Sequence, residues 1–233
     1  MIYLFSHNVY FLRVACYRTD MRGHDDPIAV NPGFRKPVFS RTEIREIAGA
    51  VTLLSVAMAI VLSGGLAGLY RTGPGMFILL LAISAVLIVF SFLLHELAHK
   101  FTAQKYGAWA EFRMYPGGLM LAIVMSLFGF LFAAPGAVYI NGRITEEMNG
   151  RISMAGPLVN LLLATGAVVF VPFTTGILSD VAFMMAYFNA FLALFNMLPI
   201  PPLDGSKIFR WNRGAYIAMF SWGIVVLALA FLI

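Results

Sequence analysis

The sequence predicts an all-α polytopic membrane protein with about five transmembrane helices and a re-entrant or membrane-associated strand and loop region. Three observations support this fold class: the composition, the lengths of the uncharged stretches and the distribution of basic residues. Of the 233 residues, 61% are hydrophobic and 12% are charged, whereas soluble domains contain about 45–50% apolar and about 25% charged residues. This composition indicates an integral membrane protein.

Five uncharged stretches are each close to the ~20 residues that a helix needs to cross about 30 Å of hydrocarbon. They predict helices near residues 47–70, 75–103, 152–172, 181–199 and 214–233. Ser40 followed by Glu43 has the spacing of a capping box, so the first helix should start near Arg41. We therefore divide the chain into a cytosolic N-terminal segment, 1–46, and a membrane domain, 47–233. Cys16 is the single cysteine, which excludes an intramolecular disulfide framework.

The apolar region 108–142 is predicted to enter the membrane and return on the same side. Prolines and glycines at 116–118 and 135–136 leave about fifteen continuous residues, or roughly 22 Å of helix, which is too short to span. Residues 109–114 alternate between apolar and charged side chains, as in a strand. A surface loop that lies on the membrane explains this segment equally well.

The basic residues favour the re-entrant interpretation. If 108–142 returns to the same side, only Arg71 is left outside, and the inner loops collect the other basic residues of the chain, including Lys100, Lys105, Arg113, Arg143, Arg151, Lys207, Arg210 and Arg213. Cytosolic loops are enriched in Lys and Arg, so the N-terminus is predicted to be cytosolic in a multi-pass protein of the cell membrane. The net charge of +5 then reflects orientation and not a nucleic-acid partner.

A metal-binding pattern, His95-Glu96-Leu97-Ala98-His99, ends one of the apolar runs. Two histidines four residues apart lie on one face of a helix and can reach a single ion. Glu96 lies about 100° further around the helix, beside the metal, where a carboxylate can hold a water and accept its proton. The alternative is a short polar patch that faces water at the end of a membrane helix.

A catalytic zinc usually has three protein ligands, so a third ligand is needed. No histidine follows His99, and the later acidic residues are Glu111, Glu146, Glu147, Asp180 and Asp204. Asp204 lies twenty-four residues after Asp180, the same separation as between Arg71 and His95, so Asp204 and His95 should reach a similar depth near the cytosolic face. A lone carboxylate in the membrane is costly unless it is paired or coordinated. We predict that Asp204 is the third ligand of one Zn²⁺ per chain.

Two motifs together resemble the site-2 protease family of intramembrane zinc metalloproteases: HELAH at 95–99 and N-x-x-P-x-P-P-x-D-G at 196–205. Gly156-Pro157-Leu158-Val159-Asn160 resembles a further element of that family. The resemblance covers roughly residues 47–205. It implies three core helices that carry the motifs, with metal ligands at His95, His99 and Asp204, a catalytic acid/base at Glu96 and a polar residue near the site at Asn196.

The predicted function is that of a zinc metalloendopeptidase that cleaves peptide bonds in or near the transmembrane segments of other membrane proteins, in regulated intramembrane proteolysis. A substrate helix must unwind first, and the strand near Phe112 could support it by pairing at an open edge. Asn160 and Asn196 could hydrogen-bond a substrate or transition-state oxygen, or they could join helices as polar contacts. The expected partners are these substrates and the lipid bilayer, with no nucleic acid.

The alternative function is a metal-ion transporter or a non-catalytic metal-binding membrane protein. A transporter requires polar groups at several depths along a path through the membrane. The ionisable residues here are predicted to lie at one level, and Glu96 is not needed as a ligand. The sequence therefore favours the protease.

Overall fold

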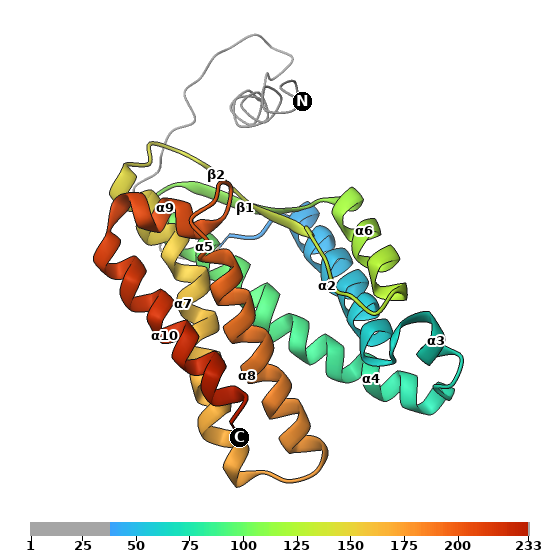
Figure 1. The fold of residues 1–233 in the computed structure, drawn as a ribbon. Helices are drawn as coiled ribbons and strands as arrows, with labels where there is room; N and C mark the ends of the chain where they lie inside the picture. Colours follow the sequence, from blue (N-terminus) through green and yellow to red (C-terminus); the bar gives the residue numbers. More distant parts are fainter. Residues whose placement is uncertain (1–37, 233) are drawn as a thin grey trace, which may run out of the picture.

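A computed structural model describes residues 38–232, which form a bundle of helices with a small sheet across one end (Figure 1). Within this range, five helical segments are long and apolar enough to cross a membrane. They are α2 (Arg41–Leu62), α4–η1–α5 (Pro74–Ile88, Val89–Leu93 and Leu94–Lys105), α7–η2 (Glu146–Phe170 and Val171–Phe173), α8 (Ile177–Asn196) and α10 (Arg213–Ala230). The predicted fold class is confirmed. Most of the predicted N-terminal segment lies outside the described residues.

Local signals set where the membrane helices begin and end. The Ser40 hydroxyl accepts a hydrogen bond from the Glu43 N–H at 3.1 Å and caps α2, as the sequence predicts. The first helix stops at Leu62, earlier than the predicted 70, because Gly64 and the residue after it have φ values of +90° and +70°. Only glycine adopts this conformation readily. The short helix α3 (Gly65–Leu69) then leads into α4.

The helices form two groups that are joined by the continuous helix α4–η1–α5. In one group α7 packs against α8, α9 (Asp204–Trp211) and α10, and in the other α2 packs against α4 and α6 (Pro116–Leu127). Figure 1 shows α9 and the sheet at the same end of the bundle. Small side chains line the contacts, for example Ala164 on α7 with Ala190 on α8. Close approach through small residues is the usual way in which membrane helices associate.

The region 108–142 contains two strands and a short helix. Strand β1 (Trp109–Met114) pairs antiparallel with β2 (Gly136–Asn141), with Phe112 opposite Val138. Between the strands, the twelve residues of α6 extend about 18 Å, which is too short to cross the hydrocarbon. The helix packs beside α2.

Carboxylates of α2 hold the outer edge of β1. The Phe112 N–H donates to Glu43 Oε1 and the Met114 N–H donates to Glu46 Oε2, both at 2.9 Å. The second oxygen of Glu43 forms an ion pair with Lys100, and both side chains of this pair are fully buried. Lys100 directly follows the HELAH motif, so Glu43 links α2, β1 and the helix that carries the histidines. Lys100 is therefore not the water-facing loop residue that the sequence suggested.

Replacing Glu43 by alanine is expected to destabilise the protein by about 3–5 kcal/mol, because the buried Lys100 ammonium loses its carboxylate. Unfolding in detergent, followed by circular dichroism, measures this effect. The control is Glu147→Ala, which breaks an exposed pair with Arg151 and should cost no more than about 1 kcal/mol. Equal stability of the two variants would show that the buried pair is not a structural link.

Candidate metal centre

Three side chains from distant parts of the chain meet at the end of the bundle. His95 and His99 lie on α5, and Asp204 is the first residue of α9. The two Nε2 atoms are 3.0 Å apart, and Asp204 Oδ2 lies 3.5 Å from His95 Nε2 and 3.1 Å from His99 Nε2. All three residues are buried, with at most 9% of any one exposed. Each offers one ligand atom toward a common centre, so the group could hold a metal ion.

The orientation of His99 is set by the backbone of α7. Its Nδ1 lies 2.8 Å from the Ile152 carbonyl oxygen, which can only accept a hydrogen bond. Nδ1 must therefore carry the proton, and Nε2 keeps its lone pair for the centre. Imidazole nitrogens and a carboxylate oxygen that face one another at 3.0–3.5 Å need a cation or a proton between them. Two histidines and a carboxylate form a donor set that suits Zn²⁺.

The connection between α8 and α9 brings Asp204 to the histidines. Helix α8 ends at Asn196, and three prolines in the next six residues prevent its continuation. Gly205 allows α9 to start close to this connection, because a Cβ at that position would lie 2.1 Å from the Met197 carbonyl oxygen. The resulting helix N-terminus also favours the negative charge of Asp204.

The Asp204 carboxyl is ionised in this environment. Burial by itself raises its pKa, but protons on the two histidines, which stand in for the positive charge of a cation at this centre, outweigh this effect and hold the pKa well below its usual range. The Lys207 ammonium, 3.4 Å from Oδ1, acts in the same direction. Asp204 is therefore negatively charged and able to bind a cation at neutral pH.

Gly156 on α7 provides the space around the ligand atoms. A Cβ at this position would lie 2.4 Å from His99 Nε2 and 2.7 Å from His95 Nε2, closer than real Cβ contacts allow. Pro157 follows within the helix and removes a backbone donor there. The Gly-Pro pair of the sequence motif thus lies directly against the histidines.

Replacing Gly156 by alanine is expected to abolish high-affinity zinc binding, since the new methyl group would occupy the space next to both Nε2 atoms. Alanine favours the helix by about 1 kcal/mol over glycine, so α7 itself should not be weakened. Zinc content by mass spectrometry, together with thermal melting, tests this. The matched control is Gly166→Ala on the same helix, where a Cβ meets nothing within 4 Å. Full zinc occupancy in Gly156→Ala would contradict the proposed position of the ion.

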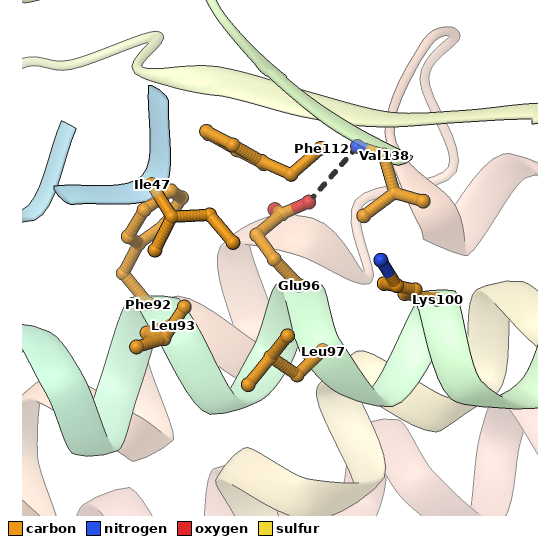
Figure 2. A pocket seen from close by; sticks show the side chains of 8 residues that line it. All are labelled: Ile47, Phe92, Leu93, Glu96, Leu97, Lys100, Phe112 and Val138. Carbon is orange, nitrogen blue, oxygen red and sulfur yellow. Dashed lines mark hydrogen bonds between the residues drawn. The ribbon is translucent and has the colours of Figure 1, made fainter. Parts of the chain in front are cut away.

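Glu96 lies on another face of α5, toward the sheet. Its Oε2 accepts a hydrogen bond from the Val138 N–H of β2 at 3.2 Å (Figure 2). It lines a small pocket between α2, α5 and the sheet, whose walls are Ile47, Phe92, Leu93, Glu96, Leu97, Lys100, Phe112 and Val138. The carboxylate is thus held between the histidine helix and the backbone of a strand, in a mostly apolar environment.

The remaining predicted site residues occupy different positions. Asn160 on α7 is fully buried, and its Oδ1 lies 2.5 Å from His95 Nδ1. Asn196, at the end of α8, donates from Nδ2 to the Leu192 carbonyl at 3.0 Å. Phe112 packs edge-on against Phe92, with ring centres 5.8 Å apart. The structure thus brings Asn160 to His95 and Phe112 to the pocket beside Glu96, whereas the amide of Asn196 bonds a carbonyl of its own helix.

Sequence reasoning did not find two residues that lie one contact away from the predicted site residues. Val138 carries no distinctive side chain, so no sequence signal points to its N–H. The side-chain oxygen of Asn189 on α8 accepts a hydrogen bond from Asn160 Nδ2 at 2.7 Å, so Asn189 reaches His95 only through Asn160. A buried polar residue on an otherwise apolar membrane helix was the available signal for Asn189.

Two imidazoles and a carboxylate are a donor set that catalytic zinc sites use, and here it lies at the end of a bundle of membrane-length helices. Comparison with known proteins agrees with a membrane metalloprotease. The model of peptidase family M50 matches residues 172–216, which include Asp204. The chain is 44% identical over 160 residues to "Putative zinc metalloprotease MJ0611" of Methanocaldococcus jannaschii, covering 67% of this chain and 81% of the relative. The chain therefore belongs to peptidase family M50, the site-2 protease family, and it is a zinc metalloprotease of the membrane.

Two further relatives are more distant. "Putative zinc metalloprotease YwhC" of Bacillus subtilis is 32% identical over 149 residues, covering 53% of this chain and 65% of the relative. "Putative zinc metalloprotease Rip3" of Mycobacterium tuberculosis is 34% identical over 137 residues, covering 55% of this chain and 31% of the relative. No solved structure matches the chain.

Proposed function

We propose that the protein is a zinc-dependent endopeptidase that hydrolyses peptide bonds in or near the transmembrane segments of other membrane proteins. The observation that carries this proposal is the position of the site: both histidines lie on a helix long enough to span a membrane, and Asp204 joins them from α9, just after the turn that follows another such helix. A peptide bond that reaches this centre must come from within or beside the bilayer.

The proposed hydrolysis requires a metal ion and a carboxylate. Zn²⁺ bound by His95, His99 and Asp204 would supply a Lewis acid that polarises the scissile carbonyl and lowers the pKa of a water. Glu96 accepts a proton from the attacking water while the water oxygen forms a bond to the carbonyl carbon. Glu96 then delivers that proton to the nitrogen of the scissile peptide bond as the C–N bond breaks. The products are a free carboxylate and a free amine.

We further propose that an unwound substrate segment extends along β2. The sequence suggested the edge near Phe112, but the outward N–H groups of Phe112 and Met114 already donate to α2 carboxylates. Helix α2 also packs along β1, whereas β2 has no second strand beside it in the described part of the chain. The outward Val138 N–H of β2 donates to Glu96, and a peptide added at this edge would take over that hydrogen bond and free the carboxylate for catalysis. Strand addition at this edge would bring an extended peptide beside the general base.

Reconstituted cleavage tests the function. The purified full-length protein is placed in liposomes with a tagged single-span polypeptide whose transmembrane helix contains a Gly-Pro pair, and the products are mapped by mass spectrometry. We expect cleavage in or near the span, loss of cleavage with a zinc chelator and recovery when zinc is added back. Zinc flux into the vesicles without any cleavage would instead identify a transporter.

The distribution of charge supports a cytosolic active site. Exposed basic residues gather at the end of the bundle that holds α9 and the sheet, among them Arg41, Arg45, Lys105, Arg143, Arg210 and Arg213, whereas Arg71 lies in the connection between α3 and α4. Cytosolic loops carry such an excess of Lys and Arg. We propose that the N-terminus and the metal centre face the cytosol.

Cysteine labelling is expected to show this topology. In a Cys16→Ser background, cysteines at Arg143 and Asn212 should react only with reagent on the cytosolic side, and cysteines at Gly73 and Thr175 only from outside. All four positions are exposed in the structure, so accessibility depends on the side of the membrane. Labelling of Arg143→Cys from outside would mean that the region before it crosses the membrane and would overturn the proposed topology.

A further inference from the structure

We infer that Asn189, on α8, is a positioning residue that fixes the His95 imidazole for metal binding through Asn160. The inference rests on the proposed zinc site and concerns two asparagines that do not contact the ion themselves. Both are fully buried; Asn160 comes from α7, which packs against α5, and Asn189 comes from α8, which packs against α7 and the π-helical turn before α5. Their hydrogen bonds form one continuous chain to His95.

The orientation of the Asn189 amide follows from its own helix. Its Nδ2 lies 2.9 Å from the Met185 carbonyl oxygen, one turn earlier on α8. A carbonyl oxygen can only accept, so the amide group on that side must be the NH₂. The Asn189 oxygen is thereby turned toward α7, where it accepts a hydrogen bond from Asn160 at 2.7 Å.

Asn160 then has a single possible orientation. Its Nδ2 donates one proton to the Asn189 oxygen and the other to the Ser91 carbonyl at 2.9 Å, which uses both protons of the amide. The remaining Oδ1 lies 2.5 Å from His95 Nδ1 and can only accept. His95 must therefore carry its proton on Nδ1 and direct the lone pair of Nε2 toward the metal centre.

Ser91 belongs to the π-helical turn Val89–Leu93, which directly precedes the HELAH helix. π-Turns insert an extra residue into a helix and are frequent at functional sites. One extra residue rotates the following helix by about 100°, so this turn helps to set which face of α5 carries the histidines. Its Ser91 carbonyl is also the second anchor of the Asn160 amide.

Loss of the Asn189 oxygen would leave the Asn160 amide nitrogen bonded to the Ser91 carbonyl alone, with one buried N–H lacking a partner. Rotation of the Asn160 amide would then place NH₂ against His95 Nδ1 and force the imidazole proton onto Nε2, where it opposes zinc binding. Mutation of groups that orient metal ligands typically lowers metal affinity by about 10–100-fold. A merely structural contact between α7 and α8 would lower stability and leave the affinity of the folded protein unchanged.

The test is the zinc affinity of full-length Asn189→Leu in detergent, measured by competition with a fluorescent chelator on protein shown to be folded by circular dichroism. We expect affinity to fall about 10–100-fold. Excess zinc should restore cleavage by Asn189→Leu. The control is Thr165→Val, which breaks a 3.1 Å hydrogen bond between α7 and Trp222 on α10 and should leave zinc affinity unchanged.

Wild-type zinc affinity in folded Asn189→Leu would overturn the inference. A second measurement needs no variant: ¹⁵N NMR of neutral His95 in metal-free wild type should show the proton on Nδ1, and a proton on Nε2 would overturn the inference equally. Failure of the wild type to bind zinc or to cleave the substrate would instead count against the proposed function. A wild type that binds zinc, together with an unaffected Asn189→Leu, counts only against the role of Asn189.

Discussion

Asp204→Ala is expected to lose its zinc and all proteolytic activity while the protein remains folded. The variant leaves only two imidazoles at the centre, whereas catalytic zinc sites use three protein ligands. Asp204→Asn sharpens the expectation, because its neutral amide keeps the shape of the side chain but binds zinc poorly. The amide also lacks the charge that pairs with both Nε2 atoms at 3.1–3.5 Å.

Metal content by mass spectrometry and cleavage of the reconstituted substrate measure these effects. The matched control is Asp180→Ala, which removes an exposed carboxylate from the first turn of α8 and should keep full zinc and full activity. If Asp204 only capped α9, alanine would cost about 1 kcal/mol of stability and leave the zinc in place. Stoichiometric zinc in both Asp204 variants would therefore remove it from the ligand set.

Glu96→Gln is expected to keep its zinc and lose proteolysis. A glutamine oxygen can still accept the hydrogen bond from the Val138 N–H, so the local structure should persist. The amide cannot accept a proton from the attacking water, and loss of a general base typically lowers the rate by about 10²–10⁴-fold. The kcat of cleavage and the zinc content, measured on the same preparation, separate these two consequences.

The control for this variant is Glu146→Gln, which changes an exposed carboxylate at the start of α7 and should leave kcat unaltered. A Glu96→Gln enzyme with wild-type kcat would exclude Glu96 as the proton acceptor. Loss of zinc from Glu96→Gln would show that the side chain supports the ligands instead.

Much of the fold could be predicted because the bilayer restricts what an apolar chain can do. Uncharged stretches of sufficient length, bounded by signals such as Ser40 and the three prolines after Asn196, fix the number of crossings. The end of α2 was placed too late, because Gly64 and Gly65 are apolar enough to extend a hydropathy run. Their positive φ values, which end the helix, appear only in the structure.

The proposed ligands could be found because each has a simple signal: the i, i+4 spacing of two histidines, and an aspartate at the end of an apolar run. The supporting residues have no such signal. Asn189 and Lys100 matter through the neighbours that packing gives them, and a sequence read one helix at a time does not say which faces meet. Lys100 illustrates this, since a lysine after an apolar run suggests solvent, yet its partner is the buried Glu43.

The most direct test of the metal centre is zinc X-ray absorption spectroscopy of the purified wild-type protein, with zinc counted per chain. The structure predicts one zinc per chain with two imidazole nitrogens at about 2.0–2.1 Å and oxygen ligands at about 2.0–2.2 Å. In Asp204→Asn at high zinc concentration, any bound ion should lose the carboxylate oxygen and keep both imidazoles. A wild-type spectrum with fewer than two imidazoles, or a chain without zinc, would contradict the account.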